Sequence, residues 1–127
     1  MVAATKTEAE KFNVKNVVTI LRDFLAEGTG LDCKSVDYVM LFNILHLEDP
    51  ILLLREAYRI LKDDGKIGVI HWNHDPSTPR WPSMAIRPRP EYCINWATKA
   101  GFVGAKRFDL KPYHYGIVLL KPRCALK

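Results

Sequence analysis

Apolar residues are grouped into short runs along the chain, and the spacing within each run predicts a secondary-structure element. Val36–Phe42 contains two valines and two aromatic residues, and Lys66–Trp72 is a second apolar run. Both are typical of strands that are covered on both faces. Between them, Ile51–Leu61 has apolar residues at helical spacing, namely Leu54, Ala57, Tyr58 and Leu61. The order strand, helix, strand predicts a parallel pair joined by a crossover helix.

Turn residues mark both ends of this central helix. Asp49 can accept hydrogen bonds from the free N–H groups of the first turn, and Pro50 suits the first helical position, where its missing donor costs nothing. At the other end, Asp63-Asp64-Gly65 predicts that the helix stops, with Gly65 in the left-handed conformation.

The residues before the first of these strands predict one more helix and one more strand. Thr5–Phe12 is rich in Lys, Glu and Ala, and Thr7 with Glu10 three residues later fits a capping box. Asn16–Leu21 is a β-branched apolar run, which predicts a strand. The carboxyl end of that strand is followed by Arg22-Asp23-Phe24.

A long loop follows the second buried strand. Asp75–Pro90 contains five prolines together with Trp81, Met84 and three arginines. Two interpretations are open. Loops of this length in compact domains are often lids or binding loops, and a proline-stiffened crossover explains the composition equally well.

The remaining residues predict a helix and an antiparallel hairpin. Pro90–Ala100 is interpreted as a helix that Gly101 terminates, with Ile94, Ala97 and Ala100 facing inward. Phe102–Leu110 and Tyr113–Lys121 are interpreted as two strands with a short connection. His114 and Tyr115 are interpreted as residues of the sheet rather than of a catalytic site.

Composition limits the class of protein. With 127 residues and 48% hydrophobic residues, the chain predicts a single α/β domain, residues 1–127, with a packed core. No apolar run has the length of a membrane span, and the polar amino-terminal residues predict a cytoplasmic location. The three cysteines are scattered, with no C-x-x-C pair, so neither a metal site nor a structural disulfide is expected.

The chain is basic, with a net charge of +5. A basic chain can bind nucleic acid. The basic residues are dispersed, however, and the sequence has no aromatic RNA-binding motif. A solvated basic surface explains the charge better than a nucleic-acid partner does.

A longer pattern runs through Val36–Trp72. An Asp lies in the first strand, a Leu-His pair follows that strand, and the helix reads L-x-E-x-x-R-x-L-K-x-x-G. The residues are Asp37, Leu45-His46, Leu54, Glu56, Arg59, Leu61, Lys62 and Gly65. This pattern resembles the fourth strand, fourth helix and fifth strand of class I S-adenosylmethionine-dependent methyltransferases of type 11, which act on small molecules. The resemblance implies a Rossmann-like sheet in which parallel strands are followed by an antiparallel hairpin.

The resemblance also implies cofactor-binding residues. It places Asp23 and Phe24 at the strand end that meets the adenine of S-adenosylmethionine, and it makes Asn43 and Ile44 candidates to line the methionine part. A carboxylate at Asp23 can accept a hydrogen bond from an exocyclic amine. The alternative for Asp23 is that it only ends a strand in water.

Two histidines are candidate catalytic bases. Ligands of open α/β sheets bind outside the carboxyl ends of the strands, and His46 and His71 occur at two such ends. A histidine with a pKa near ~6.5 can take a proton from an acceptor. The alternative for His46 is that it caps or packs the loop before the helix.

The resemblance spans roughly residues 7–122 and corresponds to the later part of the family domain. The first strand, the glycine-rich loop, the first helix and the second strand have no counterpart, so we expect a truncated or shortened methyltransferase with a small-molecule acceptor. The alternative is a non-catalytic α/β module that oligomerises or binds a protein through an exposed sheet edge. Val36–Phe42 lacks a partner on one side, and this edge predicts a homodimer.

Overall fold

The computed structural model describes residues 2–73 and 87–123. The chain forms two compact units, Met1–Gly30 and Leu31–Lys127. The two units are described separately below. No helix in the described residues is long and apolar enough to cross a membrane.

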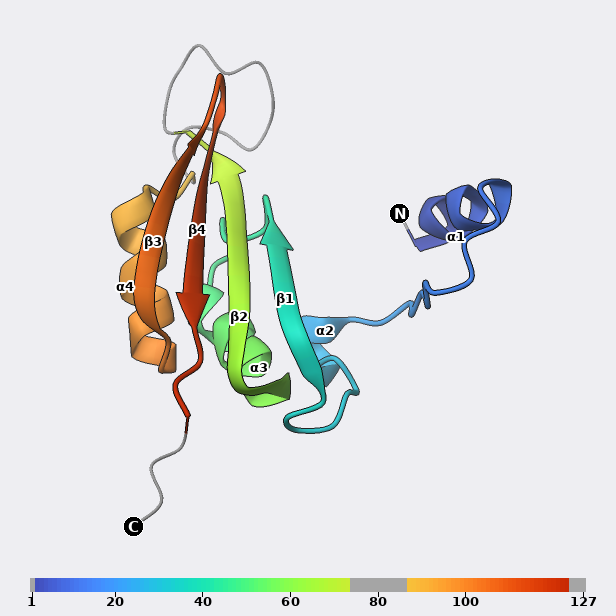
Figure 1. Ribbon diagram of the computed structural model, residues 1–127, viewed down its shortest axis with the longest axis horizontal. Coiled ribbons are helices and arrows are strands. Elements are labelled where there is room, and N and C mark those ends of the chain that lie inside the picture. The colour runs from blue at the N-terminus through green and yellow to red at the C-terminus, as the bar shows by residue number, and fades with distance from the viewer. Residues whose placement is uncertain (1, 74–86, 124–127) are drawn as a thin grey trace. The chain divides into compact units, whose positions relative to one another are not determined.

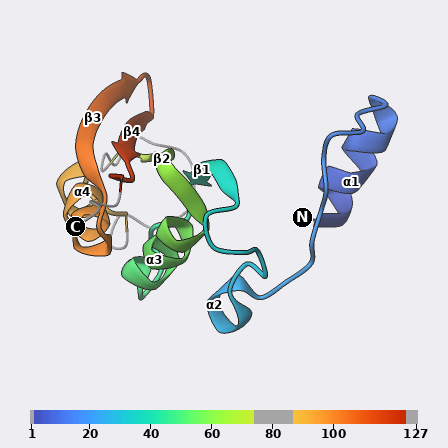
Figure 2. The same cartoon turned by 60° about the horizontal axis from the view of Figure 1, so that its bottom comes forward.

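The larger unit is a four-stranded sheet with two helices on one face (Figures 1 and 2). Its elements are β1 (Val36–Phe42), α3 (Pro50–Ile60), β2 (Leu61–Trp72), α4 (Pro90–Ala100), β3 (Val103–Leu110) and β4 (His114–Leu120). The strand order is β1-β2-β4-β3. β1 and β2 are parallel, and β4 is antiparallel to both β2 and β3. The predicted parallel pair and carboxyl-terminal hairpin are therefore confirmed.

The core lies between the sheet and the helices. Leu54 and Ala57 of α3 are buried, and so are Cys93 and Ala97 of α4. They meet the residues of β2 and β4 that point toward the helices, which are Ile67, Val69, Ile117 and Leu119. Burial of this apolar surface is the main stabilising term of the unit. The predicted inward side of α4 is only partly right, because Ile94 and Ala100 are half-buried.

The end of α3 differs from the prediction. The helix ends at Ile60, and Leu61 is already extended as the first residue of β2. Leu61 is buried as expected, with 0% of its surface exposed. The left-handed residue is Asp64, with φ 65°, rather than Gly65. Asp is one of the few residues that tolerate this conformation.

Gly65 is required for a different reason. A Cβ at this position would lie 2.7 Å from the carbonyl oxygen of Lys62 and 2.9 Å from Cδ2 of Leu61. The four residues before Lys66 bulge out of the ladder, since Val36 pairs with Leu61 and Tyr38 with Lys66. Close backbone approach within this bulge, rather than a left-handed turn, excludes a side chain at Gly65.

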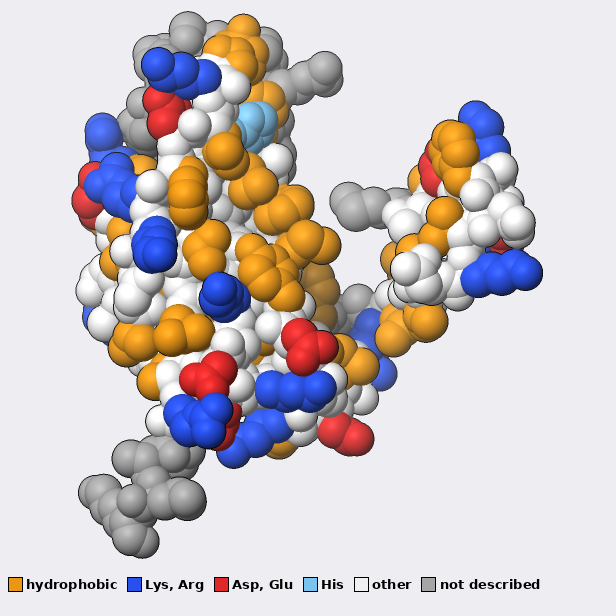
Figure 3. All heavy atoms as spheres, in the orientation of Figure 1, with side chains coloured by type: hydrophobic (Ala, Val, Ile, Leu, Met, Phe, Trp, Pro, Cys, Tyr) orange, Lys and Arg blue, Asp and Glu red, His pale blue; other side chains and the backbone are white. Residues whose placement is uncertain are grey.

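The second face of the sheet, here called the bare face, has no helix over it in the described residues of the larger unit (Figure 1). Tyr38, Met40 and Phe42 of β1 and Phe108 of β3 are all exposed. Figure 3 shows hydrophobic side chains gathered along this face. Tyr38, Phe42 and Phe108 line a hollow of about 130 Å³ whose floor includes Gly68 and Gly116. Among the described strands, β1 lies at one edge of the sheet and pairs with β2 alone.

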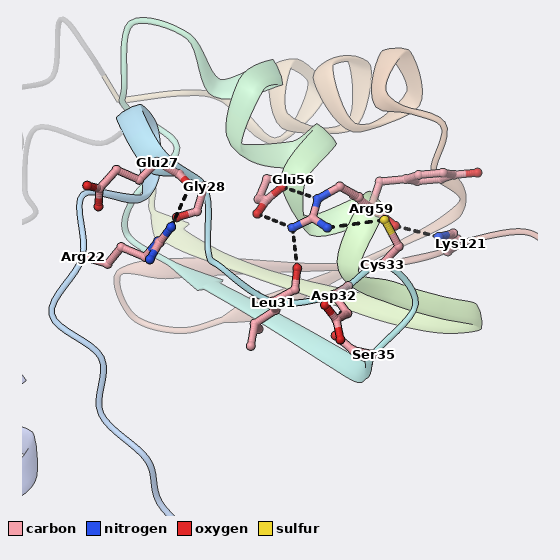
Figure 4. A network of polar contacts seen from close by, with 11 residues as sticks. Arg22, Glu27, Gly28, Leu31, Asp32, Cys33, Ser35, Glu56, Arg59 and Lys121 are labelled. Carbon is pink, nitrogen blue, oxygen red and sulfur yellow. Dashed lines mark hydrogen bonds and ion pairs between the residues drawn. The ribbon is translucent and has the colours of Figure 1, made fainter.

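One arginine holds the segment that leads into β1. The Arg59 guanidinium makes a two-point contact with the Glu56 carboxylate, at 2.7 and 2.8 Å. It also donates to the carbonyl oxygen of Leu31 at 2.7 Å and to Sγ of Cys33 at 3.4 Å (Figure 4). Arginine suits this task because its planar fork offers several donors at once. Glu56 and Arg59 of the sequence pattern therefore have a structural role.

The smaller unit contains α1 (Val2–Lys11) and α2 (Phe24–Glu27). Asn13 ends α1 in the left-handed conformation, with φ 53°. Thr7 does not cap this helix, because it lies within it and its hydroxyl donates to the carbonyl oxygen of Ala3 at 2.9 Å. The Arg22 guanidinium donates to the carbonyl oxygens of Glu27 and Gly28 at the end of α2 (Figure 4).

The predicted strand Asn16–Leu21 is not formed. These residues belong to no strand, and Val18 and Leu21 are 85% and 87% exposed. A strand is stabilised by ladder hydrogen bonds and by packing against neighbouring strands. No described residue supplies such a partner, so the β-branched composition alone does not produce a strand.

Candidate functional site

Polar side chains lie where the parallel strands β1 and β2 end. Asn43 follows β1 directly and adopts a left-handed conformation, with φ 57°. Its backbone N–H donates to the carbonyl oxygen of Ile70 at 2.6 Å, so the ladder continues one residue beyond the strand. Its side-chain oxygen Oδ1 is buried without a hydrogen-bond partner. A buried acceptor without a donor is costly, which marks this position as a candidate ligand contact.

The loop from Asn43 to Asp49 carries the next candidates. Ile44 is half-buried, and Leu45 is anchored in the core with 1% exposed. The loop ends where Oδ1 of Asp49 accepts from the N–H of Leu52 at 3.2 Å and caps α3. The predicted cap is confirmed. An anchored residue and a capped helix thus fix the two ends of the segment that presents His46.

The structure brings the two predicted histidines together. Nδ1 of His46 lies 3.4 Å from Nε2 of His71, and the rings meet edge to face with centroids 5.6 Å apart. His46 is half-buried, whereas His71 is fully buried. Because it is buried, His71 can exchange a proton with a bound substrate only through His46. Nδ1 of His71 is buried without a hydrogen-bond partner.

Both histidines favour the neutral form. Burial lowers the pKa of His71 to about 4, because desolvation disfavours the imidazolium, and the neighbouring His46 lowers it further. Burial also lowers the pKa of His46. Two neutral imidazoles can share one hydrogen bond, with one ring as donor and the other as acceptor. At neutral pH the pair is therefore uncharged and able to accept a proton.

Two further residues lie near His71. The sequence interpretation placed Arg87 in the candidate binding loop and Tyr115 in the sheet, and it linked neither to the histidines. The ring of Tyr115 stacks on that of His71, with centroids 6.4 Å apart. Arg87 is buried, donates to the carbonyl oxygen of Asn73 at 3.3 Å and lies over the ring of Trp72. The hairpin register could have indicated Tyr115, because it pairs with His71 across β2 and β4.

The predicted adenine contacts lie in the other unit. Asp23 is the N-cap of α2, and its Oδ1 accepts from the backbone N–H groups of Leu25 and Ala26 at 3.2 and 3.3 Å. Phe24 is the first residue of that helix and is half-buried. Both bonds end on Oδ1, so Oδ2 of Asp23 can still accept from a ligand. The cofactor role of these two residues stays a prediction.

Most of the predicted loop Asp75–Pro90 lies outside the described residues. No three His, Cys, Asp or Glu side chains gather into a possible metal site in the ranges 2–73 and 87–123. The histidine pair and Asn43 thus remain the candidate site of the larger unit.

A family model described as a methyltransferase domain matches residues 1–69. The chain belongs to this methyltransferase family. A type 11 methyltransferase from Sulfolobus solfataricus is 32% identical over 99% of this chain, with a TM-score of 0.72. This assignment agrees with the resemblance carried by the strand–helix–strand pattern.

More distant structures share the fold. A SAM-dependent methyltransferase from Aquifex aeolicus has a TM-score of 0.84 at 18% identity over 94% of this methyltransferase-family chain. A phosphoethanolamine N-methyltransferase from Haemonchus contortus, solved with phosphomonomethylethanolamine and S-adenosylhomocysteine, has a TM-score of 0.76 at 15% identity over 97% of the chain. The chain spans 69%, 63% and 41% of the Sulfolobus, Aquifex and Haemonchus proteins. None of the curated proteins matches it.

Proposed function

We propose that this chain takes part in S-adenosylmethionine-dependent methyl transfer to a small-molecule acceptor. The observation that carries the proposal is the set of polar side chains at the ends of β1 and β2, the place where open α/β sheets bind ligands. Family membership supports the same function.

The residues present fit the cofactor. Asn43 presents a buried acceptor without a donor, which suits the ammonium group of the methionine part. Ile44, which follows Asn43 in the larger unit, offers apolar surface. The assignment of Asp23 and Phe24 to the adenine rests on the family resemblance alone. When bound, S-adenosylmethionine supplies an activated methyl group. The contribution of the chain is to bind and orient the reactants, since methyl transfer depends on alignment of donor and nucleophile.

The histidine pair suits an acceptor that must lose a proton. His46 is the more exposed member of the pair. When its Nδ1 donates to Nε2 of His71, its own Nε2 carries the lone pair and can act as a general base. His71 then fixes the ring orientation and tautomer of His46. In this proposal His46 is the catalytic base, and His71 positions it.

Calorimetric titration with S-adenosylmethionine and S-adenosylhomocysteine tests the cofactor assignment. Asp23→Ala and Asn43→Ala should each weaken binding by ~1–3 kcal/mol, the usual cost of leaving a polar partner unpaired. Asp109→Ala, which removes a carboxylate from the surface of β3, is the matched control and should leave the affinity unchanged. Equal affinities for all variants would contradict the assignment.

His46→Gln tests the base. If His46 removes a proton, this variant should lose methyl transfer by a factor of ~10²–10⁴, the typical contribution of general-base catalysis. Binding of S-adenosylhomocysteine should be retained. A variant with full activity would exclude His46 as the base.

A second candidate function rests on the exposed edge of β1. We propose that two copies of the chain associate through this strand, because Tyr38, Met40 and Phe42 are exposed and Asp37 is its only charged residue. The Asp37 carboxylate pairs with Nζ of Lys62 at 3.3 Å. Natural edge strands usually carry unpaired charges, prolines or a cover. A non-catalytic oligomerising module would use the same surface.

Light scattering over a range of concentrations tests this association. The wild-type chain should show a dimer mass, and Met40→Lys should shift it toward the monomer. Val103→Lys, at an exposed position of the other edge strand, is the matched control. A monomer mass at every concentration would rule out the dimer.

We further propose a cytoplasmic location and a single-domain organisation. The free thiols of Cys33 and Cys93 support the location, because structural disulfides are rare in reducing compartments. The family match, which runs from residue 1 to residue 69 and so crosses the boundary between the two units, supports a single domain.

A further inference from the structure

Tyr115 is buried against the histidine pair. It is 5% exposed, and it pairs with His71 in the register of β2 and β4. Its ring is nearly parallel to the His71 ring, at an interplanar angle of 22°. His71 thus has two aromatic neighbours, the near-parallel ring of Tyr115 and the edge-on ring of His46.

The hydroxyl group of Tyr115 is fixed at the far end of the ring. It donates to the carbonyl oxygen of Pro88 at 2.8 Å, and Sγ of Cys93 lies 3.2 Å from the hydroxyl oxygen of Tyr115. A carbonyl can only accept, so the single phenolic proton points to Pro88, and the thiol of Cys93 is the donor to the phenol. Burial raises the pKa of Cys93 to about 11 and raises the pKa of Tyr115 as well. Both groups therefore keep their protons at neutral pH.

These contacts tie three parts of the fold together at one ring. The backbone of Tyr115 belongs to β4, its hydroxyl is bonded to the segment just before α4, and Cys93 lies in the first turn of α4. A tyrosine anchored at both ends cannot tilt without breaking a buried hydrogen bond, which is costly. The ring that stacks on His71 is therefore rigid.

We propose that Tyr115 is the positioning residue of the His46–His71 pair. It holds the plane of the His71 imidazole so that Nε2 meets Nδ1 of His46. The structural role of Tyr115 does not depend on a bound ligand. Its role in catalysis rests on the proposed function. Tyr115 does not itself touch the acceptor.

The charged and titratable groups around His71 come from three elements. His46 faces it from the loop after β1, and Arg87 from the segment before α4. His114 and Tyr115 belong to β4, and Cys93 acts through Tyr115. Of these, Tyr115 is the group whose ring lies nearly parallel to the imidazole, and it can be removed without changing net charge.

Histidine side-chain NMR across a pH titration tests the proposal. In the wild-type chain His71 should titrate near pH 4. Tyr115→Leu removes the stacked ring and lets water approach, so the His71 pKa should rise by about one unit or more toward its ordinary value. Tyr115→Phe keeps the ring but loses the anchor, and should give a smaller rise. Tyr58→Phe, which removes a hydroxyl group from the packing of α3, is the matched control and should give none.

Unfolding curves of each variant check that a change in the His71 pKa does not reflect loss of the fold. If Tyr115→Leu does not fold, Tyr115→Phe serves as the conservative variant. A His71 pKa unchanged in folded Tyr115 variants would overturn the proposal, whether or not the chain transfers methyl groups. The expected shift in a chain that neither binds S-adenosylhomocysteine nor transfers methyl groups would support the positioning role and count against the proposed function alone.

Discussion

The two faces of the sheet have similar residues and opposite surroundings. On β1, Leu41 faces the helices and is 8% exposed, whereas the adjacent Met40 faces the other way and is 65% exposed. On β4, Ile117 is buried beneath the helices and Val118 lies on the bare face. The difference comes from what covers each face, because the residue types are alike.

An apolar strand does not by itself show that both of its faces are covered within the same unit. Strands that are apolar on both faces are typical of sheets with a layer on each side. In the described residues of the larger unit only one layer is present, formed by α3 and α4. The bare face is therefore a surface suited to a further layer or partner, and the edge of β1 adjoins it.

Leu54→Ala should produce the largest effect on the covered face. Leu54 is fully buried beneath the sheet, so its truncation should lower the free energy of unfolding by ~2–5 kcal/mol. Leu52→Ala, on the exposed side of the same helix, should change it by less than ~0.5 kcal/mol. Denaturant unfolding of both variants measures these changes. Equal losses of unfolding free energy would show that the two sides of α3 are equally buried.

His71 should make stability depend on pH. Its pKa is about 4 in the folded chain and ~6.5 when unfolded. Between these values the unfolded chain binds a proton that the folded chain does not. The contribution of His71 is therefore complete above pH ~6.5 and is lost as the pH falls toward 4, by roughly 3 kcal/mol in total.

Unfolding measured at several pH values checks this contribution. His71→Gln should flatten the dependence in that window. His114→Gln removes an imidazole from the paired strand β4 and should retain the slope. A steep dependence that persists in His71→Gln would show that another group is responsible.

Neighbouring residues of β4 give the smallest and sharpest test. Ile117→Val deletes one buried methyl group and should cost ~0.5–1.5 kcal/mol. Val118→Ala removes more atoms from the bare face yet should cost less than ~0.5 kcal/mol. If Val118→Ala cost more than Ile117→Val, the bare face would be covered in solution.

The sequence predicted the elements that packing within the larger unit supports. Val36–Phe42, the helix after Pro50, Pro90–Ala100 and the hairpin all form. β1, both helices and β4 bury apolar residues in the core, whereas β3 is exposed along its length and is held by its ladder with β4. The predicted strand Asn16–Leu21 was wrong because a strand needs a neighbouring strand, which its own residues cannot specify. The predicted end of α3 was wrong because the bulge before Lys66 is set by pairing with β1.

The site was predicted in part for similar reasons. Strand ends are visible in a sequence, so Asn43, His46 and His71 were identified as candidates. The contact between His46 and His71 depends on the parallel pairing of β1 and β2, and the contact of Tyr115 with His71 depends on hairpin register. The pattern residues Glu56, Arg59 and Gly65 indicated the family, yet in the structure they hold the backbone.

Mapping of chemical shifts during titration with S-adenosylhomocysteine tests whether the strand ends form the ligand site. We expect the shifts to concentrate at Asn43, Ile44, His46 and His71, with Met40 and Phe108 of the bare face unchanged. Saturable binding whose shifts fall on the bare face, or no shifts at the strand ends up to millimolar ligand, would contradict this expectation.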